Sequence, residues 1–438
     1  MTVFHLIRLM RYQKIDPKLF TENRERLRQR LPKNSMVILN SNDILPTNAD
    51  GTMLLRQNSD IFYLSGIHQE ETVLIIFPDA PDEKQREMLF TKQTSELIAI
   101  WEGEKHTKES AQETSGIKNV HWLDAFPGTL RMLMTQADHV FLNTNEHARA
   151  TDKVETRDLR FIRELKNQYP LHDFRRLAPI MADLRITKSS IEVELIKKAC
   201  EITEAGFRRV LKFIKPGVKE YEVEAELIHE YLRHGSDGFA YDPIIGSGKN
   251  ACVLHYLENH DTCEDGQMVL MDVASRYANY NSDLTRTVPV NGRFTDRQKA
   301  VYNAVLRTMR ACNEMLRPGM ILKDYQEEVG KLVQSELLQL ELITQEQIDN
   351  QDPNNPAYKK YFMHGTSHHI GLDVHDVGDN WKPVCEGMVF TIEPGIYIRE
   401  ENFGCRLENN YLIGRDENID LMATIPVEVE EIEEIMNS

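Results

Sequence analysis

The sequence predicts an α/β N-terminal domain followed by an α+β C-terminal domain that is built from two related halves. In the first third, short apolar runs alternate with polar, helix-like stretches, which is typical of an α/β domain. This rhythm stops between Arg176 and Lys188, so we place the domain boundary near residue 186. Beyond it, the sequence Lys215-Pro216-Gly217 returns as Arg317-Pro318-Gly319 with an offset of 102 residues, each time between two helix-like segments.

The first domain, residues 1–186, has short strand-like runs and two helical segments. Strands are predicted for residues 36–40, 61–66, 72–77 and 139–143. Helices are predicted for residues 19–31, which follow Asp16 and Pro17, and for residues 155–167.

The second domain, residues 187–438, repeats one order of elements. Ser189 with Glu192, and later Thr295 with Gln298, form capping boxes that open long helices. Each helix ends at a Pro-Gly break, and a second helix and strands follow. We expect two α+β halves related by a pseudo-twofold axis, with the functional site between them.

Composition excludes several classes of function. The 438 residues carry a formal net charge of −17, which disfavours binding to nucleic acid or to an anionic membrane and favours a cationic ligand. The longest apolar runs, such as residues 73–77, are far shorter than the ~20 residues that cross a bilayer. The six cysteines include no CxxC pair, so we expect reduced thiols and a cytoplasmic location.

Two aspartates are the first candidate functional residues. Asp272 interrupts an apolar strand and Asp283 opens the next, and a turn centred between Tyr277 and Ala278 sets the two carboxylates directly opposite each other. Like charges about 5 Å apart repel, so this placement calls for a positive partner such as a metal ion. The alternative is one solvated aspartate and one aspartate in a turn.

A second candidate site is rich in histidine. Gly365 and Gly371 argue against a continuous helix here, so we expect a loop-to-strand site rather than a helical zinc motif. For each histidine the alternative is a packed ring hydrogen-bonded to the backbone, and this explanation suits His369 best. The histidines of this segment are His364, His368, His369 and His375.

Two glutamates follow apolar strand-like runs near the C-terminal end. Glu393 closes one run before Pro394, and Glu408 follows Arg406 by two residues, on the same face of a predicted strand. Alternatively, Glu393 accepts backbone N–H groups at the turn, and Glu408 pairs with Arg406.

Together these segments supply four carboxylates and one imidazole. Four negative charges match two divalent cations, and an oxygen-rich set with one nitrogen suits Mn²⁺, Fe²⁺, Co²⁺ or Zn²⁺. Carboxylates can bridge two metal ions about 3.5 Å apart, and such a pair makes a bridging hydroxide at neutral pH, which predicts hydrolysis of an amide or ester. The set is Asp272, Asp283, His368, Glu393 and Glu408.

Several segments carry a family resemblance. In the second domain they are GSGKNACVLHYLEN, MDVASRYANYNSDLTRTVPVNGRFT, HGTSHHIGLDVHDVG, TIEPGIYI and CRLEN. In order and spacing these resemble the pita-bread metallopeptidases, and most closely the aminopeptidase P (Xaa-Pro aminopeptidase) family. LLRQNSDIFYLSGIHQEETVLII resembles the creatinase-like N-terminal domain of that family. The resemblance implies that residues 1–186 are this N-terminal domain and that residues 187–438 are a pita-bread catalytic domain.

The resemblance also implies roles for the metal-ligating residues. Asp272 binds one metal ion, Asp283 and Glu408 bridge both, and His368 and Glu393 bind the other. Two Mn²⁺ ions are implied, with Co²⁺, Zn²⁺ and Fe²⁺ as alternatives. Glu393 would also carry the proton from the attacking water to the leaving nitrogen.

The same resemblance implies a substrate pocket next to the metals. His375 is placed near the scissile carbonyl as a hydrogen-bond donor, while His364 and His255 line the proline side and Arg406 lies at the pocket edge. Glu393, His375 and His364 are thereby the implied catalytic residues.

The implied activity is removal of the N-terminal residue from peptides whose second residue is proline, by a homodimer or homotetramer. One alternative is a prolidase that cleaves only Xaa-Pro dipeptides at the same metals, and another is a metal-free creatinase-like hydrolase or binding protein. Trp101 resembles an aromatic residue that this family can lend to a neighbouring subunit. Two features depart from the family pattern: His369 replaces a usually aromatic or apolar residue, and residues 344–362 form a longer, more polar segment.

Overall fold

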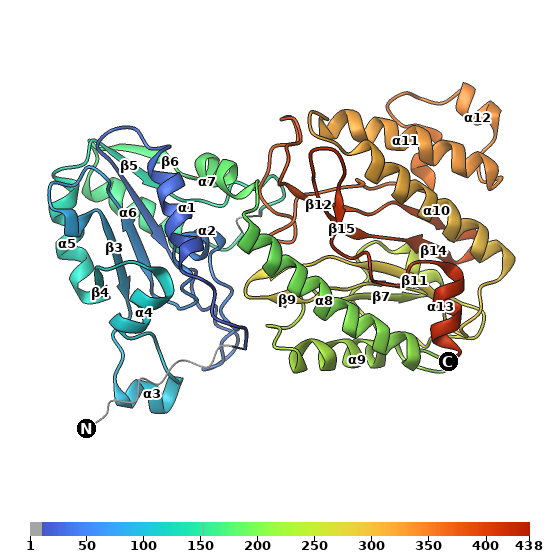
Figure 1. Cartoon of the computed structure of the whole chain (residues 1–438), viewed down its shortest axis with the longest axis horizontal. Helices are drawn as coiled ribbons and strands as arrows, with labels where there is room; N and C mark the ends of the chain where they lie inside the picture. Colours follow the sequence, from blue (N-terminus) through green and yellow to red (C-terminus); the bar gives the residue numbers. More distant parts are fainter. Residues whose placement is uncertain (1–10, 152) are drawn as a thin grey trace. The chain divides into compact units, whose positions relative to one another are not determined.

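The computed structural model describes residues 11–151 and 153–438 and divides the chain into two compact units, Met1–Arg185 and Ile186–Ser438 (Figure 1). Within the described residues, no helix combines the length and the apolar character that crossing a membrane requires. All six cysteines are unpaired.

The first unit is built on a six-stranded sheet with the order β4-β3-β2-β1-β5-β6. Strand β1 pairs antiparallel with β2 and parallel with β5, so the sheet is mixed. The strands are β1 (Ser35–Asn40), β2 (Val73–Ile76), β3 (Glu87–Thr91), β4 (Val120–Trp122), β5 (His139–Leu142) and β6 (Asp173–Arg176). The helices are α1 (Lys18–Arg28), α2 (Ser59–Ser65), α3 (Glu96–Glu102), α4 (Lys108–Ser115), α5 (Phe126–Met134), α6 (Arg157–Gln168) and α7 (Ala178–Arg185), with short 3-10 turns η1 (Glu83–Gln85) and η2 (Leu123–Ala125).

Apolar side chains of the sheet pack against helices, as the α/β prediction requires. Ile38 and Ile75 belong to one buried cluster with Leu133 of α5 and Leu165 of α6, while α2 contacts β1 and β2 (Figure 1). The predicted α/β organisation is confirmed.

The strand predicted for residues 61–66 is wrong, because these residues lie in helix α2 and the turn that ends it. The side chain of Asn58 accepts hydrogen bonds from the backbone N–H groups of Asp60 and Ile61 and so caps this helix. All residues from Ile61 to Ser65 are buried, and a short run that is apolar on every side does not distinguish a buried helix from a buried strand.

The second unit contains two sets of helices and strands. Its helices are α8 (Ser190–Phe213), α9 (Glu220–Arg233), α10 (Asp296–Met315), α11 (Leu322–Gln339), α12 (Gln345–Asp349) and α13 (Val429–Met436), with 3-10 turns η3 (Gly248–Cys252), η4 (Ala357–Lys360) and η5 (Arg399–Glu401). Its strands are β7 (Ile244–Ser247), β8 (Met268–Asp272), β9 (Arg276–Tyr277), β10 (Tyr280–Asn281), β11 (Thr285–Pro289), β12 (Val389–Ile392), β13 (Gly395–Ile398), β14 (Phe403–Arg406), β15 (Asn409–Leu412) and β16 (Ile419–Asp420). The first set joins α8 and α9 to the sheet β11-β8-β7 and the pair β9-β10, and the second joins α10 and α11 to the sheet β12-β15-β16 and the pair β13-β14 (Figure 1).

The two Pro-Gly breaks are equivalent in structure as well as in sequence. Gly217 and Gly319 have φ angles of 94° and 95°. The N–H of Gly217 donates to Cys263 O at 2.9 Å, and the N–H of Gly319 donates to Val384 O at 2.8 Å. The predicted capping boxes at Ser189 and Thr295 are also present. These paired features confirm the predicted α+β architecture with a pseudo-twofold repeat.

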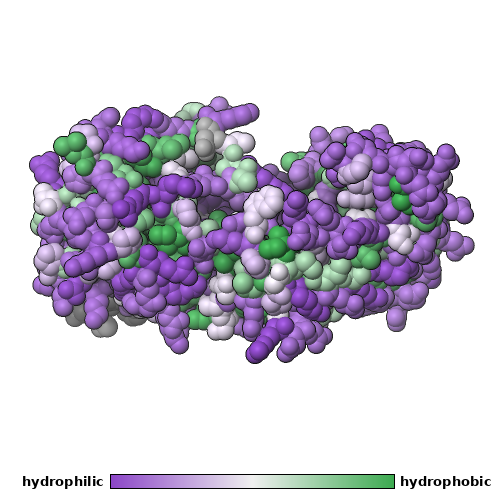
Figure 2. All heavy atoms as spheres, turned by 90° about the horizontal axis from the view of Figure 1, so that it is seen from above, coloured by the Kyte–Doolittle hydropathy of each residue, from purple (hydrophilic) through white to green (hydrophobic). Residues whose placement is uncertain are grey.

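One face of the molecule is predominantly hydrophilic (Figure 2). In Figure 2, hydrophilic residues cover most of the visible face of both units, and apolar residues form small separate groups. This distribution agrees with the high content of charged residues, 28% of the chain.

Candidate metal centre and active site

Asp272 and Asp283 are not directly opposite each other, and Asp283 lies between β10 and β11 instead of opening a strand, so both parts of that prediction are wrong. Asp272, the last residue of β8, pairs with Thr285 of β11. The turn is centred on Ala278 and Asn279, both with left-handed φ angles, of 51° and 66°. The turn centre therefore lies one residue later than predicted, between Ala278 and Asn279. This moves the partner of Asp272 by two residues, from Asp283 to Thr285. Asp283 therefore stands two residues before the partner of Asp272, offset from it along the chain.

Tyr241 connects the two aspartates. Its hydroxyl contacts a carboxylate oxygen of Asp272 and lies 2.5 Å from Oδ1 of Asp283. Burial, followed by the charge of Asp272, raises the pKa of Tyr241 well above its ordinary value, so the hydroxyl remains a hydrogen-bond donor. Tyr241 thus lies between the two carboxylates and donates its single proton to one of them at a time.

His368 presents one ring nitrogen to the carboxylates. Its Nδ1 lies 2.9 Å from the carbonyl oxygen of His369, which only accepts, so Nδ1 carries the proton. The other ring nitrogen, Nε2, lies 3.4 Å from Oδ2 of Asp283 and 3.6 Å from Oε1 of Glu393. A backbone-anchored tautomer with a free Nε2 is the usual state of a metal-ligating histidine.

Glu393 and Glu408 complete the group of carboxylates. Glu393 follows β12, and Glu408 lies between β14 and β15. The prediction that Arg406 and Glu408 share one strand is therefore wrong. Thr285 Oγ1 donates to Glu408 Oε2 at 2.7 Å. Burial raises the pKa of Glu408 and of Glu393 well above the ordinary glutamate value, with further increases from Asp283 beside Glu408 and from Glu408 beside Glu393.

Arg406 is the cation of this cluster. Its Nη2 donates to Asp272 Oδ2 at 2.7 Å and its Nη1 donates to the hydroxyl of Tyr397 at 2.8 Å. The guanidinium therefore pairs with Asp272, and the predicted alternative of an Arg406–Glu408 pair is wrong. One guanidinium does not balance four carboxylates, and the pKa of Asp283 is raised well above its ordinary value by burial and by the charge of Asp272.

The donor set fits divalent metal ions. One ligand atom each from Asp283, His368 and Glu408 lies within 4.8 Å of the others. Two ligands about 2.1 Å from one ion stand roughly 3 to 3.5 Å apart, which is close to the separations around His368 Nε2. Burial of several carboxylates with so little positive charge is costly, and metal ions would remove that cost. The structure thus brings together all five residues of the predicted ligand set.

His364 belongs to the same polar network. Its Nδ1 lies 2.8 Å from the carbonyl oxygen of Gly365 and its Nε2 lies 2.7 Å from the hydroxyl of Tyr397. Burial, with a smaller contribution from Arg406, lowers the pKa of His364 to about 3. The ring is therefore neutral at physiological pH, with Nδ1 as donor and Nε2 as acceptor.

His375 and His255 are more exposed than His364. The ring of His375 packs edge-on against His368, with 4.4 Å between centroids. His255 lies in an irregular segment after η3, and its charge contributes to the lowered pKa of His364. Both imidazoles are accessible to a ligand at the edge of the cluster.

His369 has a packing role. Its ring stacks on Phe390 with centroids 4.2 Å apart, and burial lowers its pKa to about 3. A Cβ on Gly378 would lie 2.1 Å from the ring, so the chain is shaped closely around it. The ring is packed as expected, but its buried Nδ1 has no hydrogen-bond partner within the described part of the chain, so the predicted hydrogen bond to the backbone is not present at that atom.

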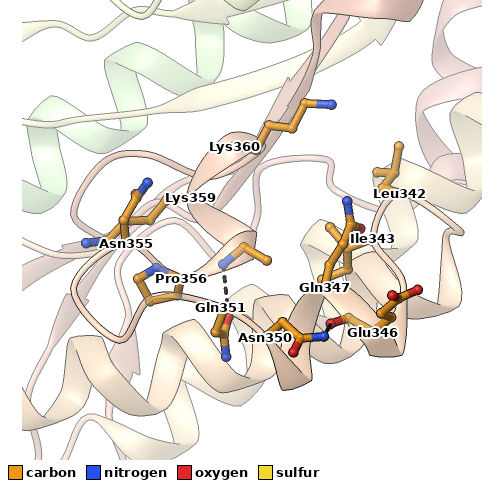
Figure 3. Close-up of a pocket in the computed structure, with 11 residues that line it drawn as sticks. Leu342, Ile343, Glu346, Gln347, Asn350, Gln351, Asn355, Pro356, Lys359 and Lys360 are labelled. Atoms are coloured by element: carbon orange, nitrogen blue, oxygen red, sulfur yellow. Dashed lines mark hydrogen bonds between the residues drawn. The ribbon is translucent and has the colours of Figure 1, made fainter.

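The polar segment before His364 forms a separate cavity. Helix α12 and the turn η4 enclose about 670 Å³ (Figure 3). Figure 3 shows amide side chains such as Gln347 and Asn350 along the helix and Lys360 pointing away from it. None of the carboxylates or histidines described above lines this cavity.

Trp101 lies in the first unit, on the short helix α3. Its side chain is 82% exposed, next to the exposed Leu97 and Ile100.

Sequence patterns did not identify three residues of the site. Tyr241, Thr285 and Tyr397 contact the candidate residues through hydroxyl groups. Tyr241 precedes the strand β7 in a loop with no pattern of its own, so a long-range contact was its only signal. Tyr397 lies in the segment TIEPGIYI, two residues after a glycine and between apolar residues. Nothing in this pattern distinguishes it from a tyrosine that only packs in the core.

Two family models match the chain. Residues 194–415 match metallopeptidase family M24, and residues 20–141 match the aminopeptidase P N-terminal domain. The Xaa-Pro aminopeptidase of Escherichia coli (strain K12) is 32% identical over 434 residues, covering 95% of this chain and 97% of the relative. Xaa-Pro aminopeptidase 3 of Homo sapiens is 28% identical over 414 residues, covering 91% of this chain and 80% of the relative.

Solved structures give the same result. A zinc-substituted E. coli aminopeptidase P in complex with product has a TM-score of 0.86 at 30% identity, covering 97% of this chain and 99% of that one. The Pseudomonas aeruginosa aminopeptidase PepP has a TM-score of 0.88 at 28% identity, covering 97% and 98%. With the M24 match over the catalytic unit and relatives along nearly its whole length, the chain belongs to metallopeptidase family M24 and carries the aminopeptidase P N-terminal domain.

Proposed function

We propose that the carboxylate cluster is a dinuclear metal centre. Asp272 would bind one ion, Asp283 and Glu408 would bridge both, and His368 and Glu393 would bind the second. The main support is that Nε2 of His368 faces the carboxylates of Asp283 and Glu393 at 3.4 and 3.6 Å, in a group with more carboxylates than cations. When bound, the ions would polarise the substrate carbonyl and activate water. Mn²⁺ is the ion that the family resemblance implies. Co²⁺, Zn²⁺ and Fe²⁺ are alternatives because they also accept this donor set.

The enzyme is a metallo-aminopeptidase, and its proposed reaction is release of the N-terminal residue from peptides with proline at the second position. The curated relatives named Xaa-Pro aminopeptidase match over nearly all of this chain, including the N-terminal domain. A proline imide nitrogen lacks a hydrogen and fixes φ, so a pocket shaped for the ring can require proline and reject ordinary peptides.

The pocket residues have distinct proposed tasks. His375 donates a hydrogen bond to the scissile carbonyl from its exposed position beside His368. Neutral His364, fixed by Tyr397, and the exposed His255 line the proline side. Arg406 bounds the pocket and keeps Asp272 oriented.

Glu393 is proposed to move a proton as well as bind metal. As a carboxylate of the ligand set, it would stand beside the water that the metal ions activate. It could take the proton from the attacking water and deliver it to the leaving imide nitrogen, which has to be protonated before proline departs.

Peptide length and sequence test this function. The metal-loaded enzyme is offered Xaa-Pro-Yaa, Xaa-Ala-Yaa and the dipeptide Xaa-Pro. Release of Xaa from the first peptide, with little release from the other two, supports the proposal. Cleavage of the dipeptide alone would make the enzyme a prolidase, and equal cleavage of both tripeptides would contradict proline specificity.

We also propose that the enzyme is a homodimer or homotetramer of the cytoplasm. The support is that α3 presents Leu97, Ile100 and Trp101, which are 65%, 77% and 82% exposed, and that large exposed apolar groups often mark association surfaces. The six unpaired cysteines suit a reducing compartment. Light scattering of the wild type and of Trp101→Glu tests assembly. An oligomer is expected for the wild type, and a monomeric wild type would contradict the proposed assembly.

A further inference from the structure

Glu220, the first residue of α9, is a buried carboxylate outside the metal cluster. Its side chain has no exposed surface. Oε1 accepts hydrogen bonds from the backbone N–H of Ser247 at 2.7 Å, from Ser247 Oγ at 2.8 Å and from Asn250 Nδ2 at 3.3 Å. Oε2 accepts from the hydroxyl of Tyr256 and from the backbone N–H of Asp261, both at 2.9 Å. All five donors are neutral, so hydrogen bonds together with the α9 N-terminus compensate for burial of the charge.

These donors span a single segment, residues 247–261. Ser247 is the last residue of β7 and is followed by the 3-10 turn η3, but the remainder is irregular, so regular backbone pairing does not fix most of the segment. Glu220 ties its beginning at Ser247, its middle at Tyr256 and its end at Asp261 to the same helix terminus. His255 lies inside this closed segment, directly before Tyr256, and its position therefore depends on the contacts of Glu220.

Tyr256 extends the connection toward the active site. Its ring belongs to a small buried cluster with Ala251, Cys252 and Tyr397. The hydroxyl of Tyr397 contacts His364 and Arg406 at 2.7 and 2.8 Å. Burial and the hydrogen bond to Glu220 raise the pKa of Tyr256 to about 12, which keeps its hydroxyl protonated as a donor.

The packing around η3 leaves little freedom for movement. A Cβ on Gly404 of β14 would lie 2.2 Å from the carbonyl oxygen of Ala251 in η3, so the two backbones are in close contact. Arg406 lies at the end of the same strand. A shift of the 247–261 segment would therefore displace His255 directly and β14 indirectly.

We propose that Glu220 is a positioning residue for the substrate pocket: it holds the 247–261 segment so that His255 and Tyr397 frame the proline side. This inference rests on the proposed function. It places the effect of Glu220 on substrate binding rather than on the metal ligands, none of which contacts residues 247–261 through the hydrogen bonds described above.

Glu220→Gln is the direct test. Whichever way the amide is turned, its NH₂ group faces a backbone N–H, either that of Ser247 or that of Asp261, so one attachment of the segment is lost. KM for Xaa-Pro-Yaa should rise about tenfold, the scale of one lost hydrogen bond to a charged group, with a smaller change in kcat and with the metal content of the wild type. Tyr256→Phe, which removes one hydroxyl and keeps the ring, should raise KM about threefold and guards against a folding failure of the first variant.

Two controls separate positioning from general destabilisation. Glu226→Gln alters a carboxylate on the same helix that pairs with Arg209 and not with residues 247–261, and it should leave KM at the wild-type value. In a His255→Ala background, Glu220→Gln should raise KM less than it does in the wild type, because part of the effect passes through His255.

The outcomes are distinct. A wild-type KM in both Glu220→Gln and Tyr256→Phe, a loss of bound metal in Glu220→Gln, or the same KM ratio with and without His255 would overturn the positioning role. Absence of turnover by the metal-loaded wild type would overturn the proposed function, and the inference with it.

Discussion

Arg406 and Asp272 form an ion pair at the edge of the carboxylate cluster, with Nη2 of the arginine 2.7 Å from Oδ2 of the aspartate. The other oxygen of Asp272 contacts the hydroxyl of Tyr241, which also contacts Asp283. The arginine also accounts for only one of four negative charges, and the pKa values of Asp283, Glu393 and Glu408 are all raised by burial. The carboxylates are thus held by hydrogen bonds, but the cluster has less positive than negative charge. Divalent cations would balance that charge.

Replacing Glu408 tests the bridging role. Glu408→Ala should abolish hydrolysis and reduce bound metal from two ions per chain to one or fewer, because a bridging carboxylate contributes to both ions. Metal content measured by atomic emission, together with tripeptide hydrolysis, checks this. Glu386→Ala removes an exposed glutamate of the same unit and should change neither quantity. Full activity in Glu408→Ala would contradict the dinuclear model.

Removing the hydroxyl of Tyr397 tests the polar network behind the pocket. Tyr397→Phe leaves Arg406 Nη1 and His364 Nε2 each without a partner at a buried position. We expect kcat/KM to fall roughly 10- to 100-fold, which corresponds to the cost of about 1–3 kcal/mol for an unsatisfied buried group.

Tyr302→Phe is the matched control for that variant. The hydroxyl of Tyr302 is also buried and donates to Val427 O at 2.8 Å, outside the carboxylate cluster. This variant should lose thermal stability and keep its kcat/KM. Equal effects of the two substitutions on catalysis would show that the loss in Tyr397→Phe is not specific to the site.

Metal removal should destabilise the unit that contains residues 186–438. Without cations, the buried carboxylates repel one another, so the chelated protein should unfold at a lower temperature. A free metal concentration of 100 Kd stabilises a folded protein by about 2.7 kcal/mol per site. Calorimetry with and without added Mn²⁺ measures the difference, and an unfolding temperature that is independent of metal would argue against binding in the folded state.

The first unit has its own pH dependence. Burial, with a smaller contribution from Asp60, raises the pKa of Asp158 to about 6, above the ordinary aspartate value. The folded state therefore binds this proton more tightly than the unfolded state, so the stabilisation is fully present at about pH 3 to 4 and is lost as the pH rises through about 6. Asp158→Asn carries no such charge, so its free energy of unfolding should exceed that of the wild type by about 3 kcal/mol at pH 8 and by little at pH 4.

Denaturant unfolding at the two pH values checks this, with Asp50→Asn as the control. Asp50 is exposed in the same unit and its replacement should leave the pH dependence of the wild type unchanged. A stability difference between Asp158→Asn and the wild type that is constant from pH 4 to pH 8 would rule out a raised pKa at Asp158.

Local signals in the sequence predicted much of the architecture. The capping boxes at Ser189 and Thr295 specify helix starts through contacts within four residues, and both are present. The Pro-Gly breaks likewise marked equivalent turns in the two halves, with Gly217 and Gly319 in left-handed conformations. Such features need no knowledge of distant parts of the chain.

The site was predicted in composition but not in geometry. Carboxylates that interrupt apolar runs, such as Asp272 and Glu393, stand out because burial of a charge needs a partner. The hairpin register was missed because Ala278, which rarely adopts a left-handed φ, occupies the turn with Asn279. Tyr241 was missed because a phenol in a loop shows its role only through a contact with residues more than 30 positions away.

A metal titration of the stripped enzyme is the most direct test of the central claim. Protein freed of metal by chelation is supplied with increasing equivalents of Mn²⁺, and release of Xaa from Xaa-Pro-Yaa is measured at each step. We predict no activity without metal and a rise that reaches its plateau at two equivalents per chain. Full activity in the stripped protein, or a plateau at one equivalent, would contradict a dinuclear metallo-aminopeptidase.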